Sequence, residues 1–227
     1  MKNLSEVLAR SAQTEGWLSR HAAVLMHFFL SHPPEGERNI LEIGVFKGKS
    51  AILLAHEAAQ RDESLILLDI EIAPPIAAIA QLHPKIEAIE ADSFKLPSLA
   101  QVQRAAPFRF IHIDGAHGYS HVLDDIKNCA KLLSWRGVIC LDDFFQPAWP
   151  DVTAAAFDFL AGRDHDLVLF LAGFNKGFLC RSIALQSYCE LIEGPLASSM
   201  EALGCKSSVK KRTQTNPFCF YGIVPER

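Results

Sequence analysis

Three aspartates follow two short apolar segments in the middle of the chain. Asp114 comes directly after Ile113, and Asp142 with Asp143 comes directly after Leu141. If the two segments are neighbouring parallel strands, about 4.8 Å apart, the three carboxylates converge on one point. Carboxylates that close need a counterion, and oxygen ligands select a hard divalent cation such as Mg²⁺, Ca²⁺ or Mn²⁺ over zinc or copper. In the alternative, the aspartates only cap turns and accept backbone N–H bonds; we favour the metal site, with Mg²⁺ as the ion.

Of the nine histidines, only His117 stands within this acidic cluster, three residues after Asp114. An imidazole can take a proton from a substrate near neutral pH, so we predict that His117 acts as a general base. A histidine in a turn also commonly has no chemical role. We interpret His112 as a strand residue and His121 as a residue on a helix face.

A glycine-containing turn runs E-I-G-V-F-K-G-K-S from Glu42 to Ser50. Gly44 and Gly48 let the backbone approach a ligand closely and open the N-terminus of a helix. The dinucleotide fingerprint GxGxxG is absent. Glu42 would repel a pyrophosphate, whereas a cationic ligand would tolerate it, so the turn favours a ligand other than a dinucleotide.

Further acids stand at the ends of the next two apolar segments. Asp69 occupies the position where an acid hydrogen-bonds ribose hydroxyls, and Asp92 with Ser93 is placed to meet the edge of a base. Taken alone, Asp92 or Ser93 is better explained as a helix cap. Together, at successive strand ends, these residues predict an adenosyl pocket.

The elements that must position these residues alternate between short apolar segments and helical patterns. An N-terminal helical region from Leu4 to Leu30 comes first, and Pro33 and Pro34 end it. We predict seven strands (39–43, 64–69, 85–90, 108–113, 137–141, 167–171 and 178–181) and five intervening helices (48–60, 76–82, 93–105, 119–133 and 152–161). Apolar strands separated by helices predict a doubly wound, mostly parallel α/β sheet of the Rossmann-like type. The connection 172–177 is too short for a crossover helix, so the last strand should run antiparallel.

Composition limits the classes of function. The chain of 227 residues is 49% hydrophobic and 21% charged with a net charge of −4, so it should form a large core, and it lacks the basic stripe of a nucleic-acid binder. We expect no membrane span and no secretion signal, and therefore a cytoplasmic protein. We divide the chain into an N-terminal helical region (1–36), a core (37–181) and a C-terminal helical extension and tail (182–227) of the same domain, and we leave open whether it forms a homo-oligomer.

These residues together resemble the class I S-adenosylmethionine-dependent methyltransferases, and most closely a metal-dependent O-methyltransferase branch that includes macrolide-sugar and aminocoumarin O-methyltransferases and cephalosporin-biosynthesis relatives. The resemblance runs from about Asn39 to Leu160 and includes the metal pattern of catechol O-methyltransferases. It implies that Asp114, Asp142 and Asp143 hold the metal. It further implies that the cofactor contacts Glu42, Gly44, Ser50, Asp69 and Asp92, and the residue pattern adds Gly48 and Ser93 to this set.

Three features depart from that family. His117 falls where catechol O-methyltransferases have their catalytic lysine, and Ala116 falls where some sugar methyltransferases have an acidic residue regarded as the base. Trp135-Arg136-Gly137 replaces the usual Pro-Gly-Gly before the fifth strand, which we expect to affect only the turn.

The resemblance implies methyl transfer from S-adenosylmethionine to a hydroxyl of a small molecule, such as a sugar or secondary metabolite, assisted by a divalent cation. Two alternatives are a nucleotide-dependent oxidoreductase on a similar sheet and a non-catalytic S-adenosylmethionine-binding protein. Phe144, Phe145 and Trp149 follow the metal residues and form either an apolar lid over the acceptor or core packing.

Overall fold

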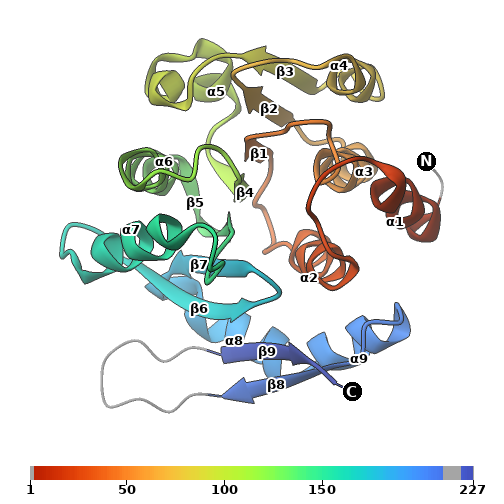
Figure 1. Ribbon diagram of the computed structural model, residues 1–227, viewed down its shortest axis with the longest axis vertical. Helices are drawn as coiled ribbons and strands as arrows, with labels where there is room; N and C mark the ends of the chain where they lie inside the picture. The colour runs from red at the N-terminus through yellow and green to blue at the C-terminus, as the bar shows by residue number, and fades with distance from the viewer. Residues whose placement is uncertain (1–2, 212–220, 227) are drawn as a thin grey trace.

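The computed structural model describes residues 3–211 and 221–226 of the chain (Figure 1). A nine-stranded sheet, in the order β3-β2-β1-β4-β5-β7-β6-β9-β8, lies between two layers of helices. The doubly wound α/β architecture predicted from the sequence is confirmed.

Two helices precede the sheet, α1 (Leu4–Gln13) and α2 (Arg20–Ser31). Each begins at a side-chain cap, because Asn3 accepts a hydrogen bond from the Ser5 N–H and Ser19 accepts one from the Ala22 N–H. The predicted N-terminal helical region is therefore two helices with a turn between them.

The chain then alternates strands and helices. The strands of this part are β1 (Ile40–Ile43), β2 (Leu65–Asp69), β3 (Ile86–Glu90), β4 (Phe108–Ile113) and β5 (Leu133–Asp142). The helices are α3 (Ala51–Arg61), α4 (Pro74–Ala80), η1 (Ser93–Ser98), α5 (Ala100–Ala105), α6 (Tyr119–Leu132) and α7 (Pro150–Ala161). One predicted helix, 93–105, is divided into the 3₁₀ helix η1 and α5, because Pro97 has no N–H to donate and Leu99 is extended.

The last part of the chain departs from the prediction of seven strands. It consists of β6 (Leu167–Gly173), β7 (Lys176–Arg181), η2 (Ser182–Ala184), α8 (Leu185–Glu193), α9 (Leu196–Ala202), β8 (Ser207–Lys211) and β9 (Tyr221–Pro225). β7 is antiparallel to β5 and β6, as predicted, but β9 and β8 extend the sheet beyond β6, and β8 is also antiparallel to its neighbour. The expected helical extension over 182–227 is thus partly strand, although 212–220 and 227 lie outside the described residues.

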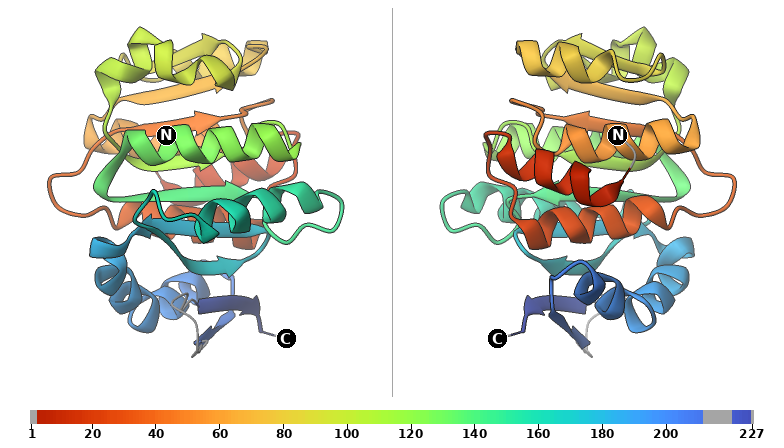
Figure 2. Two further views of the ribbon diagram at one scale, coloured as in Figure 1. Left: turned by 90° about the vertical axis from the view of Figure 1, so that its left-hand side faces the viewer. Right: turned by 90° about the vertical axis from the view of Figure 1, so that its right-hand side faces the viewer.

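Alternate residues of each strand enter two separate cores. Helices α1 to α4, α8 and α9 cover one face, and η1, α5, α6 and α7 cover the other (Figure 2). The first core takes Ile40, Leu65, Phe110 and Val138, and the second takes Leu41, Ile66, Ile111 and Ile139. Within the described residues, no helix is long and apolar enough to span a membrane.

A buried ion pair joins the sheet to the N-terminal helices. The Arg109 guanidinium on β4 donates to Glu63 Oε2 over 2.7 Å and to the carbonyl oxygen of Leu30 over 2.9 Å. Arg109 is 2% and Glu63 4% exposed. Each charge depends on the other, because an unpaired buried charge is costly.

We therefore expect Glu63→Gln to lower the free energy of unfolding by about 3–5 kcal/mol, since it leaves the Arg109 charge buried without a counterion. Urea denaturation measures the change. Glu87→Gln, on the exposed side of β3, is the matched control and should lie within about 0.5 kcal/mol of the parent. A Glu63→Gln variant as stable as the control would show that the pair does not stabilise this junction.

Candidate active site at the carboxyl edge of the sheet

The carboxyl ends of β1, β4 and β5 meet at one edge of the sheet, since these strands are parallel neighbours. Asp114 follows β4, Asp142 is the last residue of β5, and Asp143 follows it. Two groups of candidate ligand atoms form there, each within 4.8 Å: one contains His112, Asp114 and Asp142, and the other contains Asp114, His117 and Asp143. Asp142 and Asp143 thus each have a candidate ligand atom within 4.8 Å of one on Asp114.

A row of four buried polar residues runs across four neighbouring strands below this edge. Glu42 on β1 is the register partner of His112 on β4, and Glu42 Oε1 lies 2.8 Å from His112 Nδ1. His112 Nε2 lies 3.5 Å from Asp142 Oδ2, a distance of electrostatic contact rather than a good hydrogen bond. Asp142 in turn forms an ion pair with Lys176, its register partner on β7. We call these four residues the buried charge row.

The row alternates in charge, and the pKa values reflect this alternation. Burial opposes a charge on His112, but its contacts with Asp142 and Glu42 raise its pKa to about 9. Burial also opposes the Asp142 charge, yet Lys176 and His112 outweigh it and lower the pKa of Asp142. The pKa of Lys176 is raised by Asp142 despite its burial. The row therefore holds two negative and two positive charges.

Asp114 and Asp143 add two carboxylates that the row does not neutralise. Burial and the neighbouring Asp142 charge raise the pKa of Asp114 well above its usual range. No lysine or arginine forms an ion pair with Asp114 or Asp143 in the described part of the chain. A raised pKa indicates a carboxyl group that lacks a sufficient cationic partner, and aspartate oxygens are the ligands that a hard divalent cation prefers, so the donor set fits the predicted metal.

The sequence did not reveal the positive end of the row. From the sequence, Lys176 belongs to the connection 172–177, and His112 is expected only to be part of a strand. His112 does lie in β4, but its side chain faces Asp142. The signal for Lys176 was the predicted antiparallel hairpin, because a residue at the start of such a strand returns to the edge where β5 ends.

Asp143 lies between an amide and an imidazole. The Asn175 side chain donates to Asp143 Oδ1 over 2.5 Å, and His117 Nε2 lies 2.8 Å from Asp143 Oδ2. The His117 ring stacks on Trp149, with centroids 4.4 Å apart, and 31% of its side chain is exposed. His117 is thus oriented on two sides and accessible from solvent.

The first glycine of the β1 turn makes a close approach to β4. Gly44 has a φ of +79°, and a Cβ on it would lie 1.9 Å from the carbonyl oxygen of Asp114. Only glycine fits between the turn and the backbone that follows β4. The turn is also held by Asp69, whose Oδ2 accepts hydrogen bonds from the N–H groups of Val45 (2.6 Å) and Phe46 (2.8 Å).

The other predicted cofactor residues lie in the glycine turn, at the start of a helix or in the buried charge row. Gly48 has a φ of +87° and packs against Ile79 of α4, and Ser50 is the buried residue before α3. Glu42 is fully buried, and its Oε2 accepts no hydrogen bond from the described residues. Asp92 caps η1 by accepting from the Phe94 N–H over 2.9 Å, which is the capping role weighed for it, and Ser93 begins η1.

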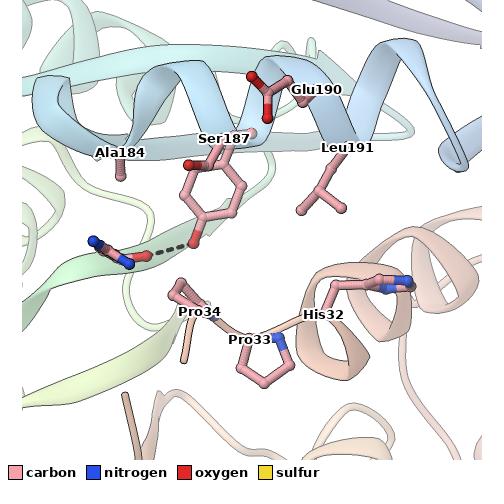
Figure 3. Close-up of a pocket in the computed structure, with 9 residues that line it drawn as sticks. His32, Pro33, Pro34, Ala184, Ser187, Glu190 and Leu191 are labelled. Carbon is pink, nitrogen blue, oxygen red and sulfur yellow. Dashed lines mark hydrogen bonds between the residues drawn. The ribbon is translucent and has the colours of Figure 1, made fainter. Parts of the chain in front are cut away.

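A pocket of about 440 Å³ lies away from this edge (Figure 3). It lies between α8 and the segment that follows α2, lined by residues that include Pro33, Pro34, Tyr188 and Leu191. The Tyr188 hydroxyl donates to the carbonyl oxygen of Arg136 near the start of β5. The pocket shares no lining residue with the candidate active site.

The core of the chain matches a family of known proteins. A family model described as a methyltransferase domain matches residues 41–144. No curated protein sequence matches the chain.

Solved methyltransferases share the fold at low sequence identity. MycE from the mycinamycin biosynthetic pathway, in complex with Mg and SAH, is 18% identical with a TM-score of 0.58, over 78% of this chain and 54% of its own. CalS11, a TDP-rhamnose 3'-O-methyltransferase of calicheamicin biosynthesis, is 15% identical with a TM-score of 0.56, over 80% and 95%. TomG, an O-methyltransferase from Streptomyces achromogenes in complex with SAM, is 23% identical with a TM-score of 0.56, over 77% and 88%.

The chain aligns with about half the length of MycE. At these identities the solved structures establish the fold. Residues 41–144 match the methyltransferase-domain model, as the sequence resemblance implies, and the sheet that contains them has the fold of these solved structures.

Proposed function

We propose that the protein transfers a methyl group from S-adenosylmethionine to a hydroxyl of a small molecule, with the help of a divalent cation. Mg²⁺ is the cation that we propose. The single observation that carries the proposal is that Asp114 shares one group of candidate ligands with Asp142 and another with Asp143, beside the glycine turn of a segment that matches a methyltransferase-domain model. Neither a nucleic acid nor a membrane is part of the proposal, and it assigns the enzyme to the cytoplasm.

The cofactor side of the site is formed by the ends of β1, β2 and β3. Gly44 opens the turn for the methionine part, and the unpartnered Oε2 of Glu42 offers an acceptor nearby. Asp69 Oδ2 holds the turn, and Oδ1, which accepts a long hydrogen bond of 3.4 Å from the Glu71 N–H, is the oxygen that we assign to the ribose. Asp92 and Ser93 would meet the adenine, with Gly48 and Ser50 completing the turn.

The metal side contains the groups that would act on the acceptor. Asp114, Asp142 and Asp143 would hold the ion, which when bound acidifies and orients the acceptor hydroxyl for in-line attack on the methyl group. His117 is within reach of Asp143 and would take the hydroxyl proton at one ring nitrogen. Asp143 orients that ring, and Trp149 stacks on it.

The acceptor side is apolar at its rim. Phe145 is 55% and Trp149 46% exposed, which suits a lid over an acceptor, whereas Phe144 is buried at 1% exposure and belongs to the core. MycE has been solved with mycinamycin VI, and CalS11 is described as acting on TDP-rhamnose. We accordingly propose a sugar or secondary-metabolite hydroxyl as the acceptor.

Cofactor binding should depend on Asp69 and Gly44. Asp69→Ala removes a ribose acceptor and releases the β1 turn, and loss of a charge-assisted hydrogen bond worth about 1.5–3 kcal/mol weakens binding at least tenfold. Gly44→Val should abolish binding, because its side chain collides with Asp114. Calorimetry with S-adenosylhomocysteine measures both, with Asp62→Ala at the other edge of the sheet as control. Unchanged affinity in both variants would show that the pocket is wrongly assigned.

Activity should require a divalent cation. EDTA should abolish methyl transfer and Mg²⁺ should restore it, and Asp143→Asn should raise the Mg²⁺ concentration needed for half-maximal rate at least tenfold, because it removes one charged oxygen ligand. Radiolabelled methyl transfer to an acceptor panel provides the rate. Full activity after chelation, with the metal shown by elemental analysis to be gone, would contradict the metal mechanism.

His117→Ala should lower kcat by about 10²–10⁴-fold, the usual effect of losing a general base, while the affinity for S-adenosylhomocysteine stays unchanged. His83→Ala, remote from the site, is the control. The rates are measured at saturating acceptor and Mg²⁺. A His117→Ala rate within a few-fold of the control would remove His117 from the proton transfer.

A further inference from the structure

Lys176 is a charged side chain that the sequence resemblance assigns to nothing. It is only 1% exposed, and its ammonium forms an ion pair with Asp142, one of the three aspartates proposed to hold the metal. A lysine buried to this extent is uncommon unless it is paired. Its counter-charge is therefore the same carboxylate that a divalent cation would use.

The β6–β7 turn fixes this contact in place. Phe174 and Asn175 both have left-handed backbones, with φ values of 52° and 67°, and they join two strands that differ in direction. Non-glycine residues adopt this conformation only where surrounding contacts hold them. Here the Asn175 carbonyl oxygen accepts from the Phe144 N–H over 3.2 Å, and the Asn175 amide donates to Asp143. The turn is thus bound to Asp143 and to the residue after it, and it places Lys176 opposite Asp142.

We propose that Lys176 is a tethered cation that neutralises and positions Asp142 when no divalent ion is bound, and that competes with the ion for this carboxylate. The inference rests on the proposed function, because it assumes that Asp142 is a metal ligand. Lys176 is a positioning residue and takes no part in methyl transfer. It keeps the site folded without metal and lowers the site's affinity for the metal.

Two opposite effects follow from removing this charge. Lys176→Met preserves much of the side-chain length but removes the competing ammonium, so divalent ions should bind more tightly. The same change leaves the Asp142 charge buried without its ion-pair partner, so the metal-free protein should be less stable. Binding of Mn²⁺ to the folded state then raises the free energy of unfolding, by an amount that grows with the logarithm of the ion concentration divided by Kd.

The test is calorimetric titration of the purified, metal-free protein with Mn²⁺, without cofactor or acceptor. We expect Lys176→Met to bind Mn²⁺ at least tenfold more tightly than wild type. Lys85→Met is the matched control, because it removes the same charge from an exposed pair with Asp62, at the other edge of the sheet, and should bind as wild type. Lys176→Arg retains the charge and should also remain close to wild type.

Thermal unfolding with and without Mn²⁺ supplies a second readout. The metal-free Lys176→Met variant should have a lower Tm than wild type, and Mn²⁺ should raise its Tm by more than it raises that of wild type. A variant that folds only in the presence of Mn²⁺ would be the extreme form of the same result. Equal or weaker Mn²⁺ affinity in Lys176→Met, with wild type binding normally, overturns the inference and leaves the proposed function intact. If neither protein binds Mn²⁺, both the inference and the metal part of the proposed function are wrong.

Discussion

Burial of the Asp142–Lys176 ion pair is the constraint on which the candidate active site depends. Two charges removed from water are tolerated only when their geometry is fixed and their remaining polar atoms are partnered. The β5–β7 register provides that geometry by placing the two residues opposite each other, and His112 and Glu42 continue the alternation of charge to β1. Four strands are thereby tied together below the edge where the reaction is proposed to occur.

The charge row also links the two halves of the site. Glu42 belongs to the strand that leads into the glycine turn, and Asp142 belongs to the proposed metal site, with His112 between them. Above the row, Gly44 contacts the backbone of Asp114, and Asp69 fixes the turn from the other side. A cofactor in the turn and an ion at the aspartates would therefore be held by one rigid set of strand ends, which is the arrangement that in-line transfer needs.

The sequence predicted the features that depend on local pattern. The strand and helix alternation, the antiparallel β7 and the positions of the aspartates at strand ends all follow from hydrophobic runs and short connections. Features that depend on pairing between distant segments were missed. His112 and Lys176 contact Asp142 only because β4 and β7 are the neighbours of β5 in the sheet; the predicted hairpin placed Lys176 near the end of β5 but did not give its register with Asp142. The edge strand β8 was not predicted because it is polar and its sequence resembles a loop, and β9 lies between it and β6.

We propose above that Asp114, Asp142 and Asp143 hold a divalent ion next to the cofactor. Crystals grown with Mn²⁺ and S-adenosylhomocysteine test it directly through the anomalous signal of manganese. The account predicts one strong peak bonded to oxygens of Asp114, Asp142 and Asp143, with the nucleoside over Gly44 and Asp69. A cofactor bound at that position with no manganese peak among the three carboxylates, at millimolar Mn²⁺, would contradict it.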